Sequence, residues 1–120
     1  MVEKVREEGY TVYKGTNVTI ETVHDKDLED QVDYIDRKIL GQSAFKRLIY
    51  VEGEDEGYLI LDGVGEFAVK PTGTLKFRIQ RADKVANKPA AYNISRLGEI
   101  DLSTATGVEK LIRAVTMADL

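Results

Sequence analysis

A helical pattern of apolar residues runs through residues 25–45. The apolar positions recur at steps of four, three and four residues: Leu28, Val32, Ile35 and Ile39. This spacing places them on one stripe of an α-helix, with acidic and basic residues on the other faces. Asp25 or Asp27 can cap the first turn, and Gly41 follows the last periodic residue. The pattern predicts an amphipathic helix that needs an apolar partner.

A second amphipathic pattern near the C-terminus supplies that partner. Its apolar positions follow at helical spacing: Val108, Leu111, Ile112 and Val115. Thr106 and Glu109 have the spacing of a capping box, in which each side chain bonds the other's backbone amide. We expect the two helices to pack together, with Ile35 and Ile39 in contact with the apolar stripe of the second helix.

Several other segments carry the alternation and turn signals of β-structure. Residues 10–23 are rich in β-branched and aromatic residues around Gly15-Thr16-Asn17, which predicts a hairpin. Further strands are expected at 45–51, 58–61, 66–70 and 74–80, the last two flanking Pro71-Thr72-Gly73. In the last strand Leu75, Phe77 and Ile79 alternate with polar residues, so one face should be buried. The polar residues 81–90 are expected to form a loop.

The first residues fit two local structures. Residues 2–8 are strongly charged and are interpreted as a helix. For residues 10–13 both structures stay open, because Val5, Gly9 and Val12 share a helical face while the local composition favours a strand. The predicted fold class is α+β, in one domain at 1–120: amphipathic helices packed side by side with β-hairpins at one end.

Composition narrows the classes of partner. Hydrophobic residues make up 42% of the chain and charged residues 32%, which is a globular balance. The net charge of −4 argues against a nucleic-acid partner. The absence of cysteine excludes disulfides, thiolate metal sites and thiol nucleophiles. No apolar run is long enough to cross a bilayer and no secretory-signal pattern is present, so no membrane partner is expected.

Two features could belong to a catalytic or metal-binding site, but both have simpler structural explanations. His24 beside Asp25 has the residue types of an acid–base pair, but no nucleophile motif accompanies it. An exposed residue before a helix cap explains it better. The acidic run at 52–56 lacks the alternating ligands of a calcium loop, so we interpret it as a solvated turn.

Two further features are equally weak as functional signals. Gly63-Val64-Gly65 lacks the third glycine and the following helix of a dinucleotide site. The basic strip of Lys76, Arg78 and Arg81 lies beside Phe77, which alternates with the charges and points inward instead of outward toward nucleic-acid bases. We therefore predict no catalytic, cofactor-binding or metal-ligating residue and no enzymatic activity.

Several short motifs nevertheless occur in an order shared with a known family. The segments are Val5-Arg6-Glu7, Gly15-Thr16-Asn17, Ile35-Asp36-Arg37, Gly41-Gln42-Ser43-Ala44-Phe45, Leu61-Asp62-Gly63, 75–83 and 97–104. Their order resembles the conserved core of bacterial flagellin, where an Arg-Glu pair, a Gly-Thr-Asn loop, an Ile-Asp-Arg helix and a Gly-Gln-Thr-x-Phe exit follow one another. The chain departs from the family in three places: an interruption after Glu7, an insertion at 46–58, and no long polymerising helix at either end.

The resemblance implies a flagellin-like core domain, a self-assembling structural subunit of the secreted, extracellular filament that drives bacterial motility. Its partners would be other copies of itself, with an export chaperone as a further candidate, and no cofactor is implied. The hook–filament junction protein is the nearest alternative. The alternative from another class is an unrelated small α+β binding or assembly domain, such as a phage structural protein. A helix at residues 2–14 favours flagellin, whereas a strand there in a closed sheet favours the binding domain.

The resemblance also implies a protein-contact segment: Lys4, Val5, Arg6, Glu7 and Glu8. In the family this segment lies on a helix that the vertebrate Toll-like receptor for flagellin reads. Lys4 stands at the position of a contacting arginine and lacks its bidentate fork. Glu8 stands at the position of a contacting leucine, and a carboxylate is costly to bury there without a partner. The resemblance therefore predicts a poor receptor agonist.

Overall fold

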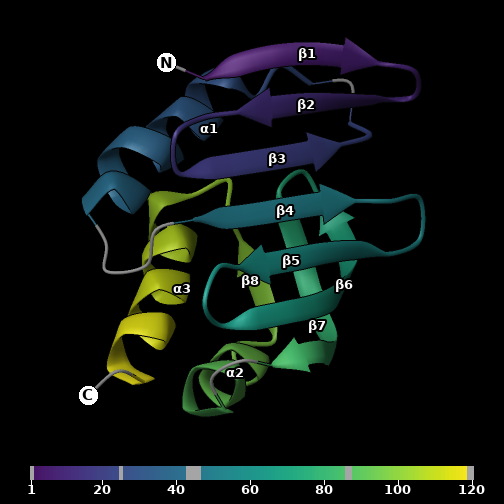
Figure 1. Cartoon of the computed structure of the whole chain (residues 1–120). Coiled ribbons are helices and arrows are strands. Elements are labelled where there is room, and N and C mark those ends of the chain that lie inside the picture. Colours follow the sequence, from purple (N-terminus) through teal and green to yellow (C-terminus); the bar gives the residue numbers. More distant parts are fainter. Residues whose placement is uncertain (1, 25, 43–46, 86–87, 119–120) are drawn as a thin grey trace.

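The computed structural model of the chain describes residues 2–24, 26–42, 47–85 and 88–118. Its centre is an eight-stranded sheet whose strands lie side by side in chain order (Figure 1). The strands are β1 (Glu3–Glu7), β2 (Tyr10–Lys14), β3 (Val18–Thr22), β4 (Leu48–Glu52), β5 (Gly57–Leu61), β6 (Gly65–Gly73), β7 (Lys76–Val85) and β8 (Glu99–Asp101). Neighbouring strands are antiparallel, except that β3 and β4 are parallel.

Helical segments connect or follow the strands where hairpins do not. They are α1 (Glu29–Tyr34), the π-helix η1 (Ile35–Ile39), the 3-10 helix η2 (Leu40–Gln42), α2 (Lys88–Ser95) and α3 (Ala105–Ala118). Parallel strands need a long crossover connection, because a tight turn only reverses the chain. The run from α1 to η2 lies between β3 and β4, so it makes the parallel pairing possible.

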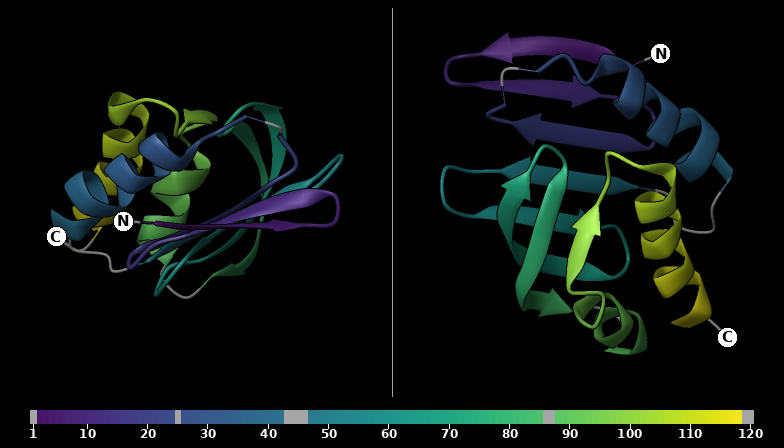
Figure 2. Two further views of the ribbon diagram at one scale, coloured as in Figure 1. Left: turned by 90° about the horizontal axis from the view of Figure 1, so that it is seen from above. Right: turned by 180° about the vertical axis from the view of Figure 1, so that it is seen from behind.

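The helices cover one face of the curled sheet, and the opposite face of β1 to β5 is left without a helix (Figure 2). The core lies between the sheet and the helices. Ile35 of η1 and Leu111 and Val115 of α3 are buried in the same core cluster, and α3 packs against η1. The predicted packing is therefore confirmed for Ile35, whereas Ile39 is only partly buried against the same core.

The predicted fold class, with helices packed side by side and hairpins at one end, is wrong. The chain is mostly β, because its strands hold more residues than its helical segments, and its sheet curls into a half-barrel. Residues 2–8, interpreted as a helix, contain β1, and residues 10–13 lie in β2. These residues form strands instead of a helix because Val5 pairs with Val12 across the hairpin, and cross-strand pairs of β-branched residues stabilise strands.

The hairpin predictions are mostly correct. The turn at Gly15-Thr16-Asn17 joins β2 to β3, and Leu75 and Phe77 are fully buried as the alternation predicted. The predicted loop at 81–90 is wrong at both ends, because β7 continues to Val85 and α2 begins at Lys88. These polar residues stay in strand conformation because β6 pairs with them, with Lys84 opposite Glu66.

The cap of the last helix is also displaced from its predicted position. Thr104 Oγ1 accepts a hydrogen bond from the Gly107 backbone N–H at 3.0 Å, so Thr104 caps α3 instead of Thr106. The first helix begins after Leu28, whose position at the cap has no side-chain capping bond, so the predicted Asp27 cap is displaced by one residue, although Asp27 Oδ1 accepts the N–H of Glu29 at 3.1 Å. The other predicted cap, Asp25, lies outside the described residues.

Candidate functional site

The predicted protein-contact segment lies at one edge of the sheet. Its residues lie in β1 and in the turn that follows: Lys4, Val5, Arg6, Glu7 and Glu8. Because side chains alternate along a strand, Val5 faces one side of the sheet and Lys4 the other. Lys4 Nζ lies 5.8 Å from the centre of the Tyr13 ring and 3.7 Å from Asp27 Oδ1. The segment is not the helical face that the resemblance implied, and a shared contact role stays a prediction.

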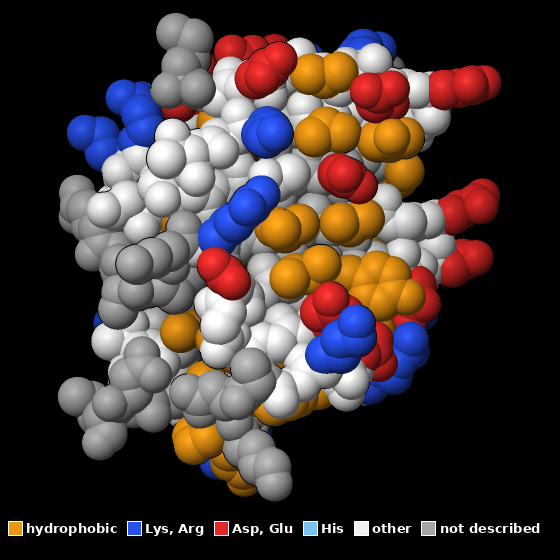
Figure 3. Space-filling view, in the orientation of Figure 1, with side chains coloured by type: hydrophobic (Ala, Val, Ile, Leu, Met, Phe, Trp, Pro, Cys, Tyr) orange, Lys and Arg blue, Asp and Glu red, His pale blue; other side chains and the backbone are white. Residues whose placement is uncertain are grey.

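The face of the sheet opposite the helices carries a cluster of apolar side chains. Ile49 pairs with Ile60, and Val51 pairs with Tyr58, across β4 and β5. We call this surface the outer patch, and its residues, all partly or fully exposed, are Val5, Val12, Ile49, Val51, Tyr58 and Ile60. Figure 3 shows hydrophobic side chains gathered over these strands, with single charged side chains among them.

Strands β4 and β5 are apolar on both faces. Their inward apolar residues are at most 1% exposed: Leu48, Tyr50, Leu59 and Leu61. The patch residues of the same strands point outward, where no helix of the described structure covers them. An antiparallel sheet with one wet face normally alternates apolar and polar residues, whereas near-continuous apolar strands are typical of sheets covered on both faces. The composition of β4 and β5 is therefore that of strands covered on both faces.

Charged side chains also lie on the outward face. Lys14 of β2 stands between Glu3 of β1 and Thr19 of β3, and Glu21, two residues further along β3, stands opposite Val12. Lys14 and Glu21 share the outward face with Val12, because side chains on one face recur at every second residue and across each pair. Neither forms an ion pair with a residue of the described segments.

The charges of the basic strip are paired within the chain. Lys76 Nζ and Arg78 Nη2 lie 3.2 and 3.6 Å from the two carboxylate oxygens of Glu99. Arg81 lies 2.8 Å from an oxygen of Glu56 and 2.8 Å from an oxygen of Asp83. These neighbouring carboxylates offset the positive field that a nucleic-acid backbone would need.

A polar cluster lies where the parallel strands β3 and β4 end, on the inward side of the sheet. Glu52 of β4 is 6% exposed, and its Oε2 accepts a hydrogen bond of 2.5 Å from the Thr22 hydroxyl of β3. Its Oε1 lies 2.9 Å from His24 Nε2, a contact of ion-pair length without hydrogen-bond geometry. The Thr22 hydroxyl also accepts the His24 backbone N–H at 3.2 Å. His24 thus pairs with Glu52, whereas the sequence suggested its neighbour Asp25, which lies outside the described residues.

The polar cluster lacks the arrangement of a catalytic site. The Thr22 hydroxyl donates to the carboxylate and not to the imidazole, so it is not activated as a nucleophile by His24. Thr22 is fully buried, and the Glu52 side chain is 2% exposed, so no substrate reaches either group. The cluster instead fastens the ends of β3 and β4 across their parallel joint.

Tyr50 adds an unusual group next to this cluster. Its ring is fully buried, and its hydroxyl has no hydrogen-bond partner among the described protein groups. Burial raises the pKa of Tyr50 far above its ordinary value of 10, and the Glu52 carboxylate raises it further. In the unfolded chain the same phenol ionises near its ordinary pKa. The contribution of Tyr50 to stability is therefore complete below that pKa and falls as the pH rises above it.

We expect Tyr50→Phe to raise the free energy of unfolding by about 1 kcal/mol at neutral pH, because it removes a buried polar group that lacks a partner. The variant should also lose less stability than the wild type when the pH rises above about 10. Urea unfolding at neutral and alkaline pH measures both effects.

Tyr13→Phe is the matched control, because the Tyr13 hydroxyl donates to the Lys26 carbonyl and accepts from the Leu28 N–H, both at 3.1 Å. It should cost about 1–3 kcal/mol. Equal losses in the two variants would show that the Tyr50 hydroxyl is satisfied in solution.

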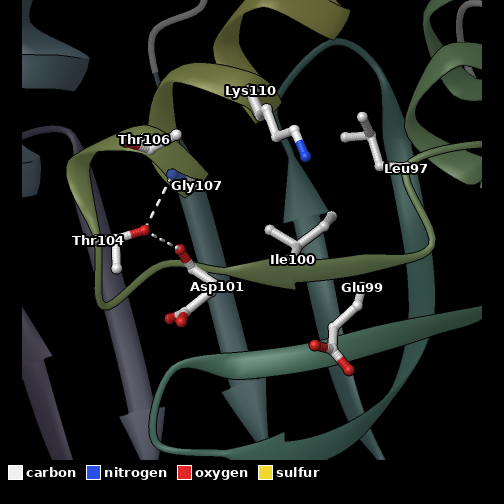
Figure 4. A pocket seen from close by; sticks show the side chains of 8 residues that line it. All are labelled: Leu97, Glu99, Ile100, Asp101, Thr104, Thr106, Gly107 and Lys110. Atoms are coloured by element: carbon white, nitrogen blue, oxygen red, sulfur yellow. Dashed lines mark hydrogen bonds between the residues drawn. The ribbon is translucent and has the colours of Figure 1, made fainter.

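A small pocket lies between β8 and the start of α3 (Figure 4). It has a volume of about 180 Å³, and its lining includes Glu99, Asp101, Thr104 and Lys110. Most of these polar groups already serve the fold, because Asp101 accepts the Ser103 N–H at 2.9 Å and Thr104 caps α3. In Figure 4 the Glu99 carboxylate points away from Lys110. The pocket therefore offers no convergent set of groups for catalysis.

The remaining sequence features are structural where the structure describes them. Gly63-Val64-Gly65 forms the turn from β5 to β6, and Glu56 of the acidic run pairs with Arg81. The described residues contain no group of three or more histidine or acidic side chains that could hold a metal ion. Within the same segments no helix is long and apolar enough to span a membrane.

Comparison with known proteins gives no match: no family model, curated protein or solved structure is similar to this chain.

Proposed function

We propose that this chain is a non-enzymatic assembly domain that binds a second copy of itself through the outer patch. The observation that carries the proposal is the apolar composition of β4 and β5 on both faces, of which the helices cover only one. Moving the outward side chains of these strands out of water supplies a favourable free energy of about 25 cal/mol per Å².

A second copy offers charges of both signs to this face. The outward face holds Lys14, Glu3 opposite it on β1, and Glu21 on β3, and none of the three is ion-paired among the described residues. A partner must offer both signs if it is not to leave a buried charge unpaired. An identical surface offers both. Two open sheets also pack well face to face, with their strands within about 30° of each other.

Self-assembly is the part of the flagellin resemblance that this proposal keeps, by a different surface. The role in a flagellar filament, the secretion and the export chaperone rest on the order of short motifs, and they stay predictions. The strands β1 and β2 at residues 3–14 favour the alternative of a small binding or assembly domain, although the sheet is open and not closed.

We expect Ile60→Lys to abolish the self-association at concentrations where the wild type is dimeric. Ile60 lies on β5 opposite Ile49, so a lysine there places a charge on the apolar surface of the patch. Loss of an important apolar contact costs about 2 kcal/mol, which corresponds to about a 30-fold higher Kd. Sedimentation equilibrium over a concentration series measures the change.

Tyr34→Lys is the matched control, because Tyr34 is 43% exposed and lies on the helical side of the molecule. This variant should associate like the wild type, and both variants should keep the wild-type melting temperature within a few degrees. A wild-type chain that stays monomeric at several hundred micromolar would overturn the proposal. So would an Ile60→Lys chain that dimerises as tightly as the wild type.

A further inference from the structure

A groove with a basic wall lies between the last two helices. It has a volume of about 260 Å³ and is lined by Asn93 of α2, by Leu97, and by Lys110, Arg113 and Ala114 of α3. We call it the α2–α3 groove. Leu97 and Lys110 also line the pocket between β8 and the start of α3, so the two hollows adjoin. In Figure 4 the Lys110 side chain extends from α3 toward Leu97. Because helices form it, the groove lies on the face of the sheet opposite the outer patch.

The two cations of the groove keep their charge unneutralised by the described segments. Lys110 and Arg113 are exposed and lie three residues apart, so they share one face of α3. Neither forms an ion pair with a described residue, and this includes Glu109, four residues before Arg113. The two acids of the adjoining pocket are engaged elsewhere: Glu99 pairs with the basic strip, and Asp101 accepts a backbone N–H before α3. The groove is therefore a local excess of positive charge on a chain whose net charge is −4.

We infer that the α2–α3 groove binds an acidic peptide segment of a partner protein, in which two carboxylates flank one apolar residue. In an extended peptide, alternate side chains point to the same side and lie about 7 Å apart. Residues three apart on a helix have Cβ atoms about 5–6 Å apart, so two such carboxylates reach Lys110 and Arg113 together. The arginine fork binds a carboxylate through two parallel hydrogen bonds. The residue between the carboxylates points the other way, where the apolar side chains of Leu97 and Ala114 receive it.

A nucleic acid fits the groove less well than an acidic peptide. Its affinity comes mainly from many phosphate contacts with lysine and arginine, whereas this groove offers two cations. Single-stranded bases also stack on aromatic rings, and the described residues that line the groove include no aromatic side chain. The site goes beyond self-association, because it would let an assembled form of the chain recruit a second, acidic protein on its other face.

Fluorescence anisotropy with a labelled peptide tests the site. The probe is fluorescein-labelled Gly-Glu-Leu-Glu-Gly, titrated at low salt because salt screens exposed charges. Lys110→Glu and Arg113→Glu should each weaken binding about 5-fold, and together about 30-fold, since each replaces an attraction by a repulsion. Lys70→Glu is the matched control, because Lys70 is an exposed lysine of β6 outside the groove and its reversal changes the net charge equally. It should keep the wild-type affinity within about 2-fold.

Two altered peptides separate the charged contact from the apolar one. Gly-Gln-Leu-Gln-Gly should bind about 30-fold more weakly than the probe, because it has no carboxylate to pair with the cations. Gly-Glu-Ser-Glu-Gly should bind about 10-fold more weakly, because it lacks the buried leucine. Ile60→Lys should bind the probe like the wild type, so a failure of self-association would leave this site intact.

Four results would overturn the inference. They are no binding of the probe by the wild type at about 1 mM, equal binding of the glutamine peptide, wild-type affinity in the Lys110→Glu/Arg113→Glu double variant, and tighter binding of a labelled oligothymidylate than of the probe. The last result would assign the groove to nucleic acid. Circular dichroism melting of each variant shows that a loss of binding is not a loss of fold.

Discussion

Phe77→Ala should lower the free energy of unfolding by about 3–5 kcal/mol, as expected for removing a large buried ring. Phe77 of β7 is fully buried, and its ring stacks on Tyr50 of β4 with 4.9 Å between centroids and 19° between planes. Strands β4 and β7 are not neighbours in the sheet, so the stack joins two strands that only the curl brings together. A domain of this size is stable by about 5–15 kcal/mol, so the loss is a large fraction of the total.

Guanidinium unfolding followed by circular dichroism measures this loss. Phe77→Leu is the control, because it keeps an apolar side chain in the same space and removes only the ring contact. Phe77→Leu should lower the free energy of unfolding less than Phe77→Ala does, because leucine fills most of the cavity that alanine would leave. A loss below about 1 kcal/mol for Phe77→Ala would contradict a core role for the stack.

Asp36→Ala should cost about 3 kcal/mol or more, because the two hydrogen bonds that it removes both end on a buried charged group. Asp36 of η1 is 2% exposed. Its carboxylate oxygens accept the backbone N–H groups of Thr16, at 3.2 Å, and Asn17, at 2.5 Å. Alanine would leave both N–H groups in the turn between β2 and β3 without that acceptor.

The turn is shaped for this carboxylate. A Cβ added at Gly15 would lie 2.5 Å from the Asp36 Cγ, so a larger residue there collides with the acid. Asp36→Asn should cost less than Asp36→Ala, since the amide keeps one acceptor oxygen. Asp62→Ala, at an exposed turn position, should change stability by less than about 0.5 kcal/mol. Similar unfolding free energies for Asp36→Ala and Asp62→Ala would refute the role of Asp36.

Local pattern predicted those elements whose partners are close in the chain. The hairpin around Gly15-Thr16-Asn17 and the alternation of Leu75 and Phe77 have their signals within a few residues, and both are present. The helix expected at residues 2–8 failed because its charged composition suits an edge strand equally well. Charged side chains on an edge strand also discourage pairing with further chains, and the motif order pointed to helix.

The polar contacts depend on pairings that span long stretches of sequence. His24 meets Glu52 because β3 and β4 pair in parallel through a helical crossover, and nothing local to His24 encodes that register. Asp36 of η1 likewise meets the turn at Gly15 only in the folded chain, because the two are far apart in the sequence. The sequence predicted part of the outer patch, because it predicted β4 and β5 as strands. It did not show which face of these strands the helices would leave uncovered, since that depends on the fold.

The order of the strands has a consequence for how the chain folds as it is synthesised. Every pair of neighbouring strands except β3–β4 is antiparallel, so two meanders, β1–β3 and β4–β8, can form from local contacts. The joint between them closes the longest loop, and closure of longer loops costs more entropy. Because the chain emerges from the ribosome in order at about 5–20 residues per second, the first meander emerges a few seconds before β4 does. During that interval the inner side of Tyr13 and Ile20, fully buried in the finished protein, faces solvent. The parallel joint is therefore where correct folding and aggregation compete.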